Sequence, residues 1–550
     1  MKAWAFAVAV ALAVPHTAAR EPSAGSLPAD IPVCKPAQRK AYLPSAEEIA
    51  AHRLSDAPVI RYPYGTEMPN GGWDMELTMR VDASGRVVCY SDLDRFGRKQ
   101  TVSGQRTALL RDLRYRPFRR DGQAVEATLT EGIAEEELPQ ERRPLPEVPL
   151  EQVRIVLSRS GCLGTCPDYR VELHGNGEAV YEGNYFVDVE GKHAYRVDPS
   201  RVAALVGSLR AKDLWSLRPS YRARVTDNPT YVLSLTLGAQ THAIEDYVGE
   251  RAGMPRAVSE FEREVDEVSR SAMWIRLEPE ALKLLESEGF DFASAAGADL
   301  LARAVANENG QEAVLLELIA LGAPTEPARR TPKDDPKWDV GSSESIVTMA
   351  LRRRHTKLAA ALIDEGALET GGRVDPVKLN EAFAAAIAGG GLAGVQRVWE
   401  AADGKPYPSL SFLDTSGDDD KPDRKQVPVS LMLYRNVYPP RPMEGVEIAQ
   451  WLAARGCDLK ARGADGDTLL HNAAAAGDAK LVRYLLDQGL DPSTPGQFDL
   501  PALGSARDEE VALMLLQAGT DLSKLGDFRQ YVDSNRWNRV DAWLQANRDR

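Results

Sequence analysis

A chain of 550 residues is too long to fold around one hydrophobic core, so about three or more domains are expected. Hydrophobic residues make up 43% of the chain, which is ample for globular folding and excludes a wholly disordered protein. The formal net charge of −14 argues against nucleic acid or an anionic membrane as a partner, because phosphate binding needs clustered Lys and Arg.

The first residues, MKAWAFAVAVALAVPHTAAR, have the pattern of a secretory signal peptide. One Lys precedes an apolar run at residues 3–14, and a Pro and small residues follow, so cleavage is expected after Ala19. The run is short for a membrane span, and a retained membrane anchor is the alternative. With residues 1–19 removed, we expect a chain without membrane insertion in a bacterial periplasm, or secreted.

Residues 20–70 are rich in Pro and polar residues and are expected to be extended, either packed on a neighbour or mobile. In the next block, the stretch WDMELTMRV alternates apolar and polar residues, as a half-buried strand does. RVVCYSDL returns after a DASG turn as its hairpin partner. A helix is predicted around residues 106–113, and YRPFRRDGQAVEATLTEGI predicts a turn and a last strand.

This strand–strand–helix–strand order over residues 71–137 resembles the C-terminal domain of TonB-type energy transducers. The matching marks are the DASGRV turn, the aromatic-x-Pro of Tyr115 and Pro117, and DGQAV leading into the last strand. The resemblance implies a small α+β domain with a structural or partner-binding use. Unlike a true transducer, the chain is expected to keep no anchor helix, and it has no long Pro/Lys spacer, so coupling to a membrane motor is not implied.

A Glu- and Pro-rich stretch at residues 138–150 predicts a semi-rigid spacer. Residues 151–275 then predict a small α+β domain with an antiparallel sheet. Its expected elements are a strand, QVRIVLSRS, two hairpins in DYRVELHGNGEAVYEG and TYVLSLTLGAQTHAIEDY, a helical stretch at 199–217, and the closing amphipathic helix PRAVSEFEREVDEVSRSAMWI.

Several motifs in this block are similar to those of a widespread exported bacterial family, a domain of unknown function. They are C-x-G-x-C-P-x-Y at residues 162–169, G-x-x-x-Y-x-G at 177–183, Thr226 with Asp227, and a closing helix that ends in Trp. The resemblance implies export and supplies no activity.

Five cysteines have to be placed, and an oxidising compartment favours disulfides. Cys162 and Cys166 are candidates for one bridge, because Gly161 and Gly164 allow a tight loop that brings the two Cβ atoms together. Loop entropy in so short a loop gives about 2 kcal/mol of stabilisation.

A second candidate bridge joins Cys34 and Cys89. It closes a much longer loop, for which the same model gives about 4 kcal/mol. Cys457 is the odd cysteine, because it lies far away in a helical repeat.

Two alternatives for Cys162 and Cys166 stay open. A redox role needs a thiolate stabilised by a helix N-terminus or by cations, whereas Pro167 and a strand follow this pair. A metal role would add His174 or His193 to the two thiolates to complete a tetrahedron. The exported setting makes the structural disulfide the preferred hypothesis.

Residues 276–550 are helical and repetitive. The stretch DGDTLLHNAAAAGDAKLVRYLLDQGLDPS at 465–493 resembles an ankyrin repeat, with Leu469 where that pattern has Pro. Weaker copies are EAVLLELIALGAPTE, KLAAALIDEGALET, VEIAQWLAARGCDLK and EEVALMLLQAGTDLS. The glycines predicted to end their second helices are Gly322, Gly366, Gly456, Gly489 and Gly519.

Insertions are predicted at residues 324–345 and 403–426, and the stretches EALKLLESEGFDF and VDAWLQANRDR are expected to cap the stack. His471 invites a metal or catalytic interpretation. Its spacing from Thr468 is that of a structural hydrogen bond in ankyrin-like units, which we take to be its role.

The chain contains no G-x-x-x-x-G-K-[ST], H-E-x-x-H or G-x-S-x-G motif. A run of three Asp at residues 418–420 lacks the spaced ligands of a calcium loop and is expected to be a solvated insertion. No catalytic, cofactor-binding or metal-binding residue is therefore predicted, and no enzymatic activity or cofactor is expected.

The sequence thus predicts two small α+β domains followed by an all-α, ankyrin-like solenoid. The preferred function is a non-catalytic, exported protein–protein interaction protein whose repeats bind an unidentified protein partner. The alternative is a periplasmic thiol-redox or copper/zinc-handling protein centred on Cys162 and Cys166. A stress or immunity role in the cell envelope is a third possibility that no residue selects, and the oligomeric state is not predicted.

Overall fold

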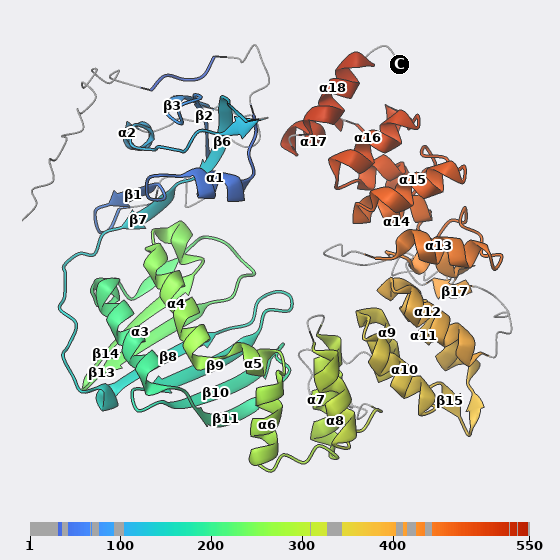
Figure 1. The fold of residues 1–550 in the computed structure, drawn as a ribbon, viewed down its shortest axis with the longest axis horizontal. Coiled ribbons are helices and arrows are strands. Elements are labelled where there is room, and N and C mark those ends of the chain that lie inside the picture. The colour runs from blue at the N-terminus through green and yellow to red at the C-terminus, as the bar shows by residue number, and fades with distance from the viewer. Residues whose placement is uncertain are drawn as a thin grey trace, which may run out of the picture. The chain divides into compact units, whose positions relative to one another are not determined.

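The chain divides into two compact units in a computed structural model (Figure 1). The first unit is formed by Met1–Ile60, Glu76–Asp94 and Lys99–Ile133, and the second by Arg61–Met75, Arg95–Arg98 and Ala134–Arg550. The structure describes residues 31–35, 42–66, 68, 76–92, 104–120, 122–307, 310–326, 344–402, 411–414, 425–434, 443–526, 528–535 and 537–547. The predicted signal peptide and the Asp run at 418–420 lie outside the described residues.

The first unit is a small sheet with short helices. Its described strands β2, β3 and β6 form an antiparallel sheet in the order β3-β2-β6. Strand β2 buries every second residue, as the alternation predicted. The elements are α1 (Ala46–His52), β2 (Glu76–Val81), β3 (Val87–Tyr90), α2 (Gly104–Leu110), β4 (Arg119–Arg120), β5 (Gln123–Ala124) and β6 (Ala127–Gly132).

Two features of this unit differ from the sequence expectation. Helix α1 interrupts the segment expected to be extended, because Ser45 caps the amide of Glu48 at 3.1 Å and Ile49 is buried. The unit also ends at Ile133 rather than at residue 137. Strand β7 (Ala134–Glu137) belongs to the second unit, where the Arg218 guanidinium lies 2.8 Å from the Glu137 carboxylate.

A sheet of seven strands, all within the described residues 153–247, forms the first part of the second unit. Helices α3 (Pro199–Ala211) and α4 (Arg256–Ser269) lie side by side over one face of it (Figure 1). The order is β11-β10-β9-β8-β13-β14-β12, in which only β12 and β14 pair in parallel. The strands are β8 (Val153–Arg159), β9 (Asp168–His174), β10 (Glu178–Tyr185), β11 (Gly191–Arg196), β12 (Ser220–Arg222), β13 (Tyr231–Leu237) and β14 (Gln240–Tyr247).

The two faces of this sheet differ in polarity. Residues such as Leu157, Val171 and Leu233, which are register partners on β8, β9 and β13, are fully buried on one face. The alternate positions carry charge, including an ion pair between Arg154 and Glu172. The helical stretch predicted at 199–217 is split, because α3 ends at Ala211 and a 3-10 turn follows at Leu214–Ser216.

The stretch predicted to be a spacer instead lies along this domain. The backbone amide of Arg143 donates to the Ser216 hydroxyl at 2.8 Å, and Leu145, Val148 and Leu150 pack against the core. We call residues 143–147 the strap. Its Pro content restricts the backbone whether or not it contacts a domain, so composition alone does not distinguish a strap from a spacer.

After this domain, most of the second unit consists of two rows of short helices (Figure 1). In the described residues the inner row runs α7–α9–α11–η5–α14–η7 and the outer row runs α8–α10–α12–α13–α15–α16–α18, each member contacting the next. Two repeats have only a 3-10 turn, η5 (Val429–Met432) or η7 (Ala502–Ser505), where the others have an inner helix. The helices are α6 (Pro279–Ser287), α7 (Ala295–Ala306), α8 (Glu312–Ala320), α9 (Ile346–Arg353), α10 (Thr356–Asp364), α11 (Pro376–Gly389), α12 (Leu392–Ala401), α13 (Gly445–Ala453), α14 (Leu469–Ala476), α15 (Ala479–Asp487), α16 (Glu509–Gln517), α17 (Phe528–Ser534) and α18 (Asn538–Ala546).

The predicted glycines end the outer helices. Gly322, Gly366, Gly456, Gly489 and Gly519 all have φ between 77° and 94°, the left-handed region in which a Cβ is disfavoured. The predicted insertions lie mostly outside the described residues, although 403–426 contributes β17 (Ser411–Asp414) and the start of β18 (Lys425–Pro428). The described chain is therefore a mixed α/β region followed by a helical array.

Candidate functional site

A short loop between two repeats, residues 495–500, presents an aromatic side chain to solvent. We call this loop the finger. The amide of Gly496 donates to the Leu500 carbonyl at 2.7 Å, and the amide of Asp499 donates to the Gly496 carbonyl at 3.2 Å. The preceding repeat also fixes the finger, because the Asp467 carboxylate accepts from the Gln497 amide at 2.7 Å.

Phe498 occupies the tip of the finger. Its side chain is 83% exposed, and its φ of 58° is followed by a φ of 60° at Asp499. Positive φ is unfavourable for a bulky residue, and such conformations persist where the surrounding structure imposes them. Lys524 helps to hold this backbone conformation by donating a hydrogen bond to the Asp499 carboxylate at 2.7 Å. The array thus holds an aromatic ring in solvent on a constrained backbone.

His471 connects the finger to the ankyrin-like repeat before it. Its Nδ1 accepts from the Thr468 amide at 3.1 Å, which closes a capping box at the start of α14. Its Nε2 lies 3.2 Å from the Leu500 carbonyl, so the neutral ring donates from this nitrogen. Burial lowers the pKa of His471, which keeps the ring neutral. These contacts agree with the structural role expected for this residue.

Replacing His471 with Ala removes both contacts and is expected to lower the free energy of unfolding by about 1–3 kcal/mol. Urea denaturation followed by circular dichroism measures the loss. Lys480→Ala, an exposed change on α15, is the matched control and should stay within about 0.5 kcal/mol of the parent. Equal losses for the two variants would show that His471 does not join the repeats.

A second set of hydrogen bonds joins the outer helices of successive repeats. The carboxylate of Glu312, at the start of α8, accepts from the Lys357 and Leu358 amides at 2.5 and 3.1 Å, at the start of α10. Glu509, at the start of α16, does the same for Arg539 and Val540 of α18 at 2.5 and 3.3 Å. Negative charge at a helix N-terminus is stabilising, so each repeat supports the next one.

Two disulfides are present among the described residues, and they join the four candidate cysteines in the expected pairs. Cys34 and Cys89 lie with Cα atoms 4.9 Å apart, and Cys162 and Cys166 with Cα atoms 5.5 Å apart. Cys457 is buried in the array, and burial raises the pKa of its thiol.

The two histidines considered as metal ligands have other partners. His174 Nε2 lies 2.9 Å from the Glu172 carboxylate. His193 contacts the Glu288 carboxylate through Nδ1 at 2.8 Å and the Glu190 carbonyl through Nε2 at 3.0 Å. In the part of the chain that the structure describes, no group of three or more His, Cys, Asp or Glu is placed to hold a metal ion.

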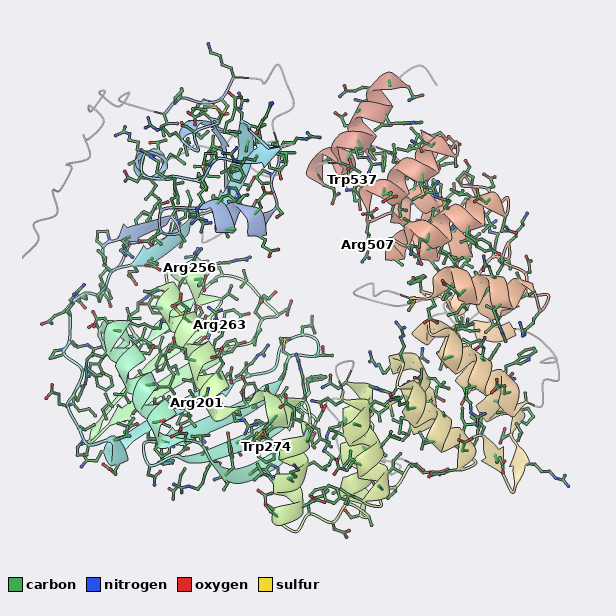
Figure 2. All side chains as sticks on the ribbon, in the orientation of Figure 1. Arg201, Arg256, Arg263, Trp274, Arg507 and Trp537 are labelled. Carbon is green, nitrogen blue, oxygen red and sulfur yellow. A yellow bond between two sulfur atoms is a disulfide. The ribbon has the colours of Figure 1, made fainter. Side chains whose placement is uncertain are left out.

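The sheet motifs serve packing. Tyr169, which ends the C-x-G-x-C-P-x-Y motif, donates to Asp266 of α4 at 2.8 Å. Tyr181 stacks on Trp274, which is labelled in Figure 2, with ring centroids 5.6 Å apart. A Cβ on Gly183 would lie 2.4 Å from the Val189 carbonyl oxygen, so only glycine fits there. Tyr169 and Tyr181 thus join strands to the closing helices, whereas Thr226 and Asp227 lie in an exposed loop.

A buried acid on α4 was not predicted as a special residue. Glu262 is 5% exposed, and its Oε1 has no hydrogen-bond partner among the described residues. Burial, together with Asp246, Asp266 and Glu250, raises the pKa of Glu262 to about 9. The sequence does contain a sign of this burial, because Glu262 lies four residues after Val258 and therefore on the apolar stripe of the helix.

Polar contacts connect the domain built on the seven-stranded sheet, called the sheet domain below, to α7, which is the first inner helix of the repeat array. Asn307 donates to the Asp188 carboxylate at 3.2 Å, and Arg303 donates to the Asp188 carbonyl at 2.9 Å. Arg303 also lies 3.1 Å from the Glu190 carboxylate. Burial raises the pKa of Asp188 to about 7. The loop between β10 and β11 therefore ties the domain to α7.

No helix among the described residues is both long and apolar enough to cross a membrane.

Comparison with known families identifies two segments. Residues 153–269 match the model of a domain of unknown function (DUF6438), and residues 465–496 match that of the ankyrin repeat. These matches confirm a domain of unknown function followed by an ankyrin repeat. The likeness of residues 71–137 to a TonB C-terminal domain stays a prediction.

No curated protein matches the chain. Among solved structures, the human ASB11 ankyrin repeat domain is 19% identical, with a TM-score of 0.25 over 40% of this chain and 85% of that one. The ankyrin repeat domain of Bcl-3 is also 19% identical, with a TM-score of 0.24 over 43% of this chain and 91% of that one.

Proposed function

We propose that this protein is a non-catalytic, exported protein–protein interaction protein whose repeat array is the binding surface. The ankyrin match at residues 465–496 supports a protein-interaction role. Repeat arrays bind through extended complementary surfaces and need no deep pocket. The signal-peptide pattern of residues 1–19 supports export to the periplasm.

The observation that carries the proposal is the exposed ring of Phe498 on the finger. Aromatic side chains dominate the binding energy of many protein interfaces, because they bury a large area at little cost in side-chain entropy. The constrained backbone of the finger also favours binding, because less conformational entropy is lost when the loop meets a partner. The partner is then a protein with an apolar pocket that accepts one aromatic ring.

The sheet domain has the role of positioning the array. Its contacts through Asp188 with Arg303 and Asn307 hold the first inner helix against the domain. The TonB-like module at residues 71–137 is assigned a docking role, from its resemblance to a partner-binding domain.

Replacing Phe498 with Ala is expected to weaken capture of the protein partner by about thirtyfold or more. The measurement is affinity capture by the full chain from the envelope of its host, with thermal unfolding recorded in parallel. The fold should be unaffected, because the ring is exposed.

The matched control is Leu163→Ala, which removes a side chain that is 72% exposed in the sheet domain. This control should capture as much partner as the parent chain. If Leu163→Ala lost the partner while Phe498→Ala kept it, the binding surface would lie in the sheet domain and the proposal would be wrong.

A further inference from the structure

A cavity of about 700 Å³ lies between the strap and one corner of the sheet domain. Its size is that of small-molecule sites in proteins, which typically measure about 300–1,000 Å³. The strap forms one wall, and the start of β14 together with the 3-10 turn after α3 forms the other.

The floor of the cavity is aromatic. Trp215 is 6% exposed, and it packs edge-on against His242 with ring centroids 5.5 Å apart. His242 is 9% exposed, and its Nε2 has no hydrogen-bond partner among the described residues. Burial and the charge of Arg143 lower the pKa of His242, so the ring is neutral.

The rim of the cavity carries one charge of each sign. Arg143 and Glu147 both line it from the strap, four residues apart. One guanidinium nitrogen of Arg143 donates to the Leu217 carbonyl at 3.3 Å, which leaves further N–H groups of the side chain for a ligand. A carboxylate suits Arg143, and an ammonium group suits Glu147.

We propose that this cavity binds a free, zwitterionic α-amino acid with an apolar side chain. The ligand carboxylate pairs with Arg143, its ammonium group with Glu147, and its side chain lies on Trp215. A peptide terminus carries only one of the two charges, so it can pair with either Arg143 or Glu147 but not with both. This binding is independent of the protein partner of the array.

The test is calorimetric titration of the full chain with three matched probes. Phenylalanine carries both charges, 3-phenylpropionate lacks the ammonium group, and phenethylamine lacks the carboxylate. Phenylalanine should bind most tightly, by about tenfold over each of the others, because each charge-assisted contact contributes separately. Equal affinities for the three probes, or no binding of phenylalanine, would overturn the proposal.

Variants assign the contacts. Arg143→Gln should remove the advantage of phenylalanine over phenethylamine, and Glu147→Gln should remove its advantage over 3-phenylpropionate. Arg142→Gln is the matched control, because this neighbouring side chain is 89% exposed and does not line the cavity. The three substitutions are at exposed positions, so thermal unfolding should be unchanged. If Arg142→Gln weakened binding as much as Arg143→Gln, the effect would be general electrostatics and the assignment would fail.

Discussion

A chain in which Cys34 and Cys89 are both replaced by serine is expected to lose about 4 kcal/mol from the free energy of unfolding of the first unit. The bridge closes a loop with a sequence separation of 55, so it restricts the unfolded chain strongly. Beside the bridge, the Cys34 amide donates to the Tyr90 carbonyl at 2.7 Å. For a small domain such a loss is a large share of total stability, and partial unfolding at 37 °C is expected.

Hydrogen exchange read by mass spectrometry measures this loss for each unit separately. The control replaces both Cys162 and Cys166 with Ser. These two residues are separated by only 4 positions, so the expected loss of unfolding free energy is about 2 kcal/mol and is confined to the sheet domain. Thiol titration of the denatured, unreduced parent should find one thiol, that of Cys457. Three or more thiols, or unchanged exchange in the first unit of the Cys34/Cys89 variant, would contradict the two-bridge arrangement.

Replacing Glu262 with Gln should remove a pH dependence from the stability of the second unit. The folded pKa of Glu262, about 9, lies above the ordinary glutamate value of 4.5, so the folded state keeps a proton that the unfolded state releases. Stability therefore falls as pH rises between these two values and levels off above the folded pKa. At pH 8 the parent has lost several kcal/mol of stability that the glutamine variant, which cannot ionise, retains.

Urea denaturation at intervals from pH 5 to pH 9 tests this prediction. The parent midpoint should fall steadily with pH, and the Glu262→Gln midpoint should fall less, because Asp246 and Asp266 also have raised pKa values and keep part of the slope. Glu267→Gln, an exposed change on the same helix, should follow the parent. A parent midpoint that stays level or rises across this range would be evidence against a buried, protonated Glu262.

Local patterns predicted much of the fold. Leu77, Met79 and Val81 alternate along β2 because each faces the core, and their burial follows that alternation. The glycines that end the outer helices were identifiable because the left-handed conformation excludes most other residues. The sequence does not predict strand β12, because its three residues are too few to show an alternation of apolar and polar side chains.

The remaining features depend on contacts between distant residues. The strap reaches Ser216 across 73 residues, and a Pro-rich composition does not encode that contact. The exposure of Phe498 was not predictable either, because an aromatic residue in a loop is as compatible with burial as with solvent. The disulfide partners were predicted because five cysteines leave few pairings and the signal-peptide pattern predicts an oxidising compartment.

Photo-crosslinking at position 498 tests the central claim most directly. With p-benzoyl-phenylalanine in place of Phe498, irradiation of living cells should attach one partner protein to the array. The same amino acid in place of Leu163 should give no adduct. Adducts at position 163 with none at position 498 would show that the sheet domain, and not the repeat array, is the binding surface.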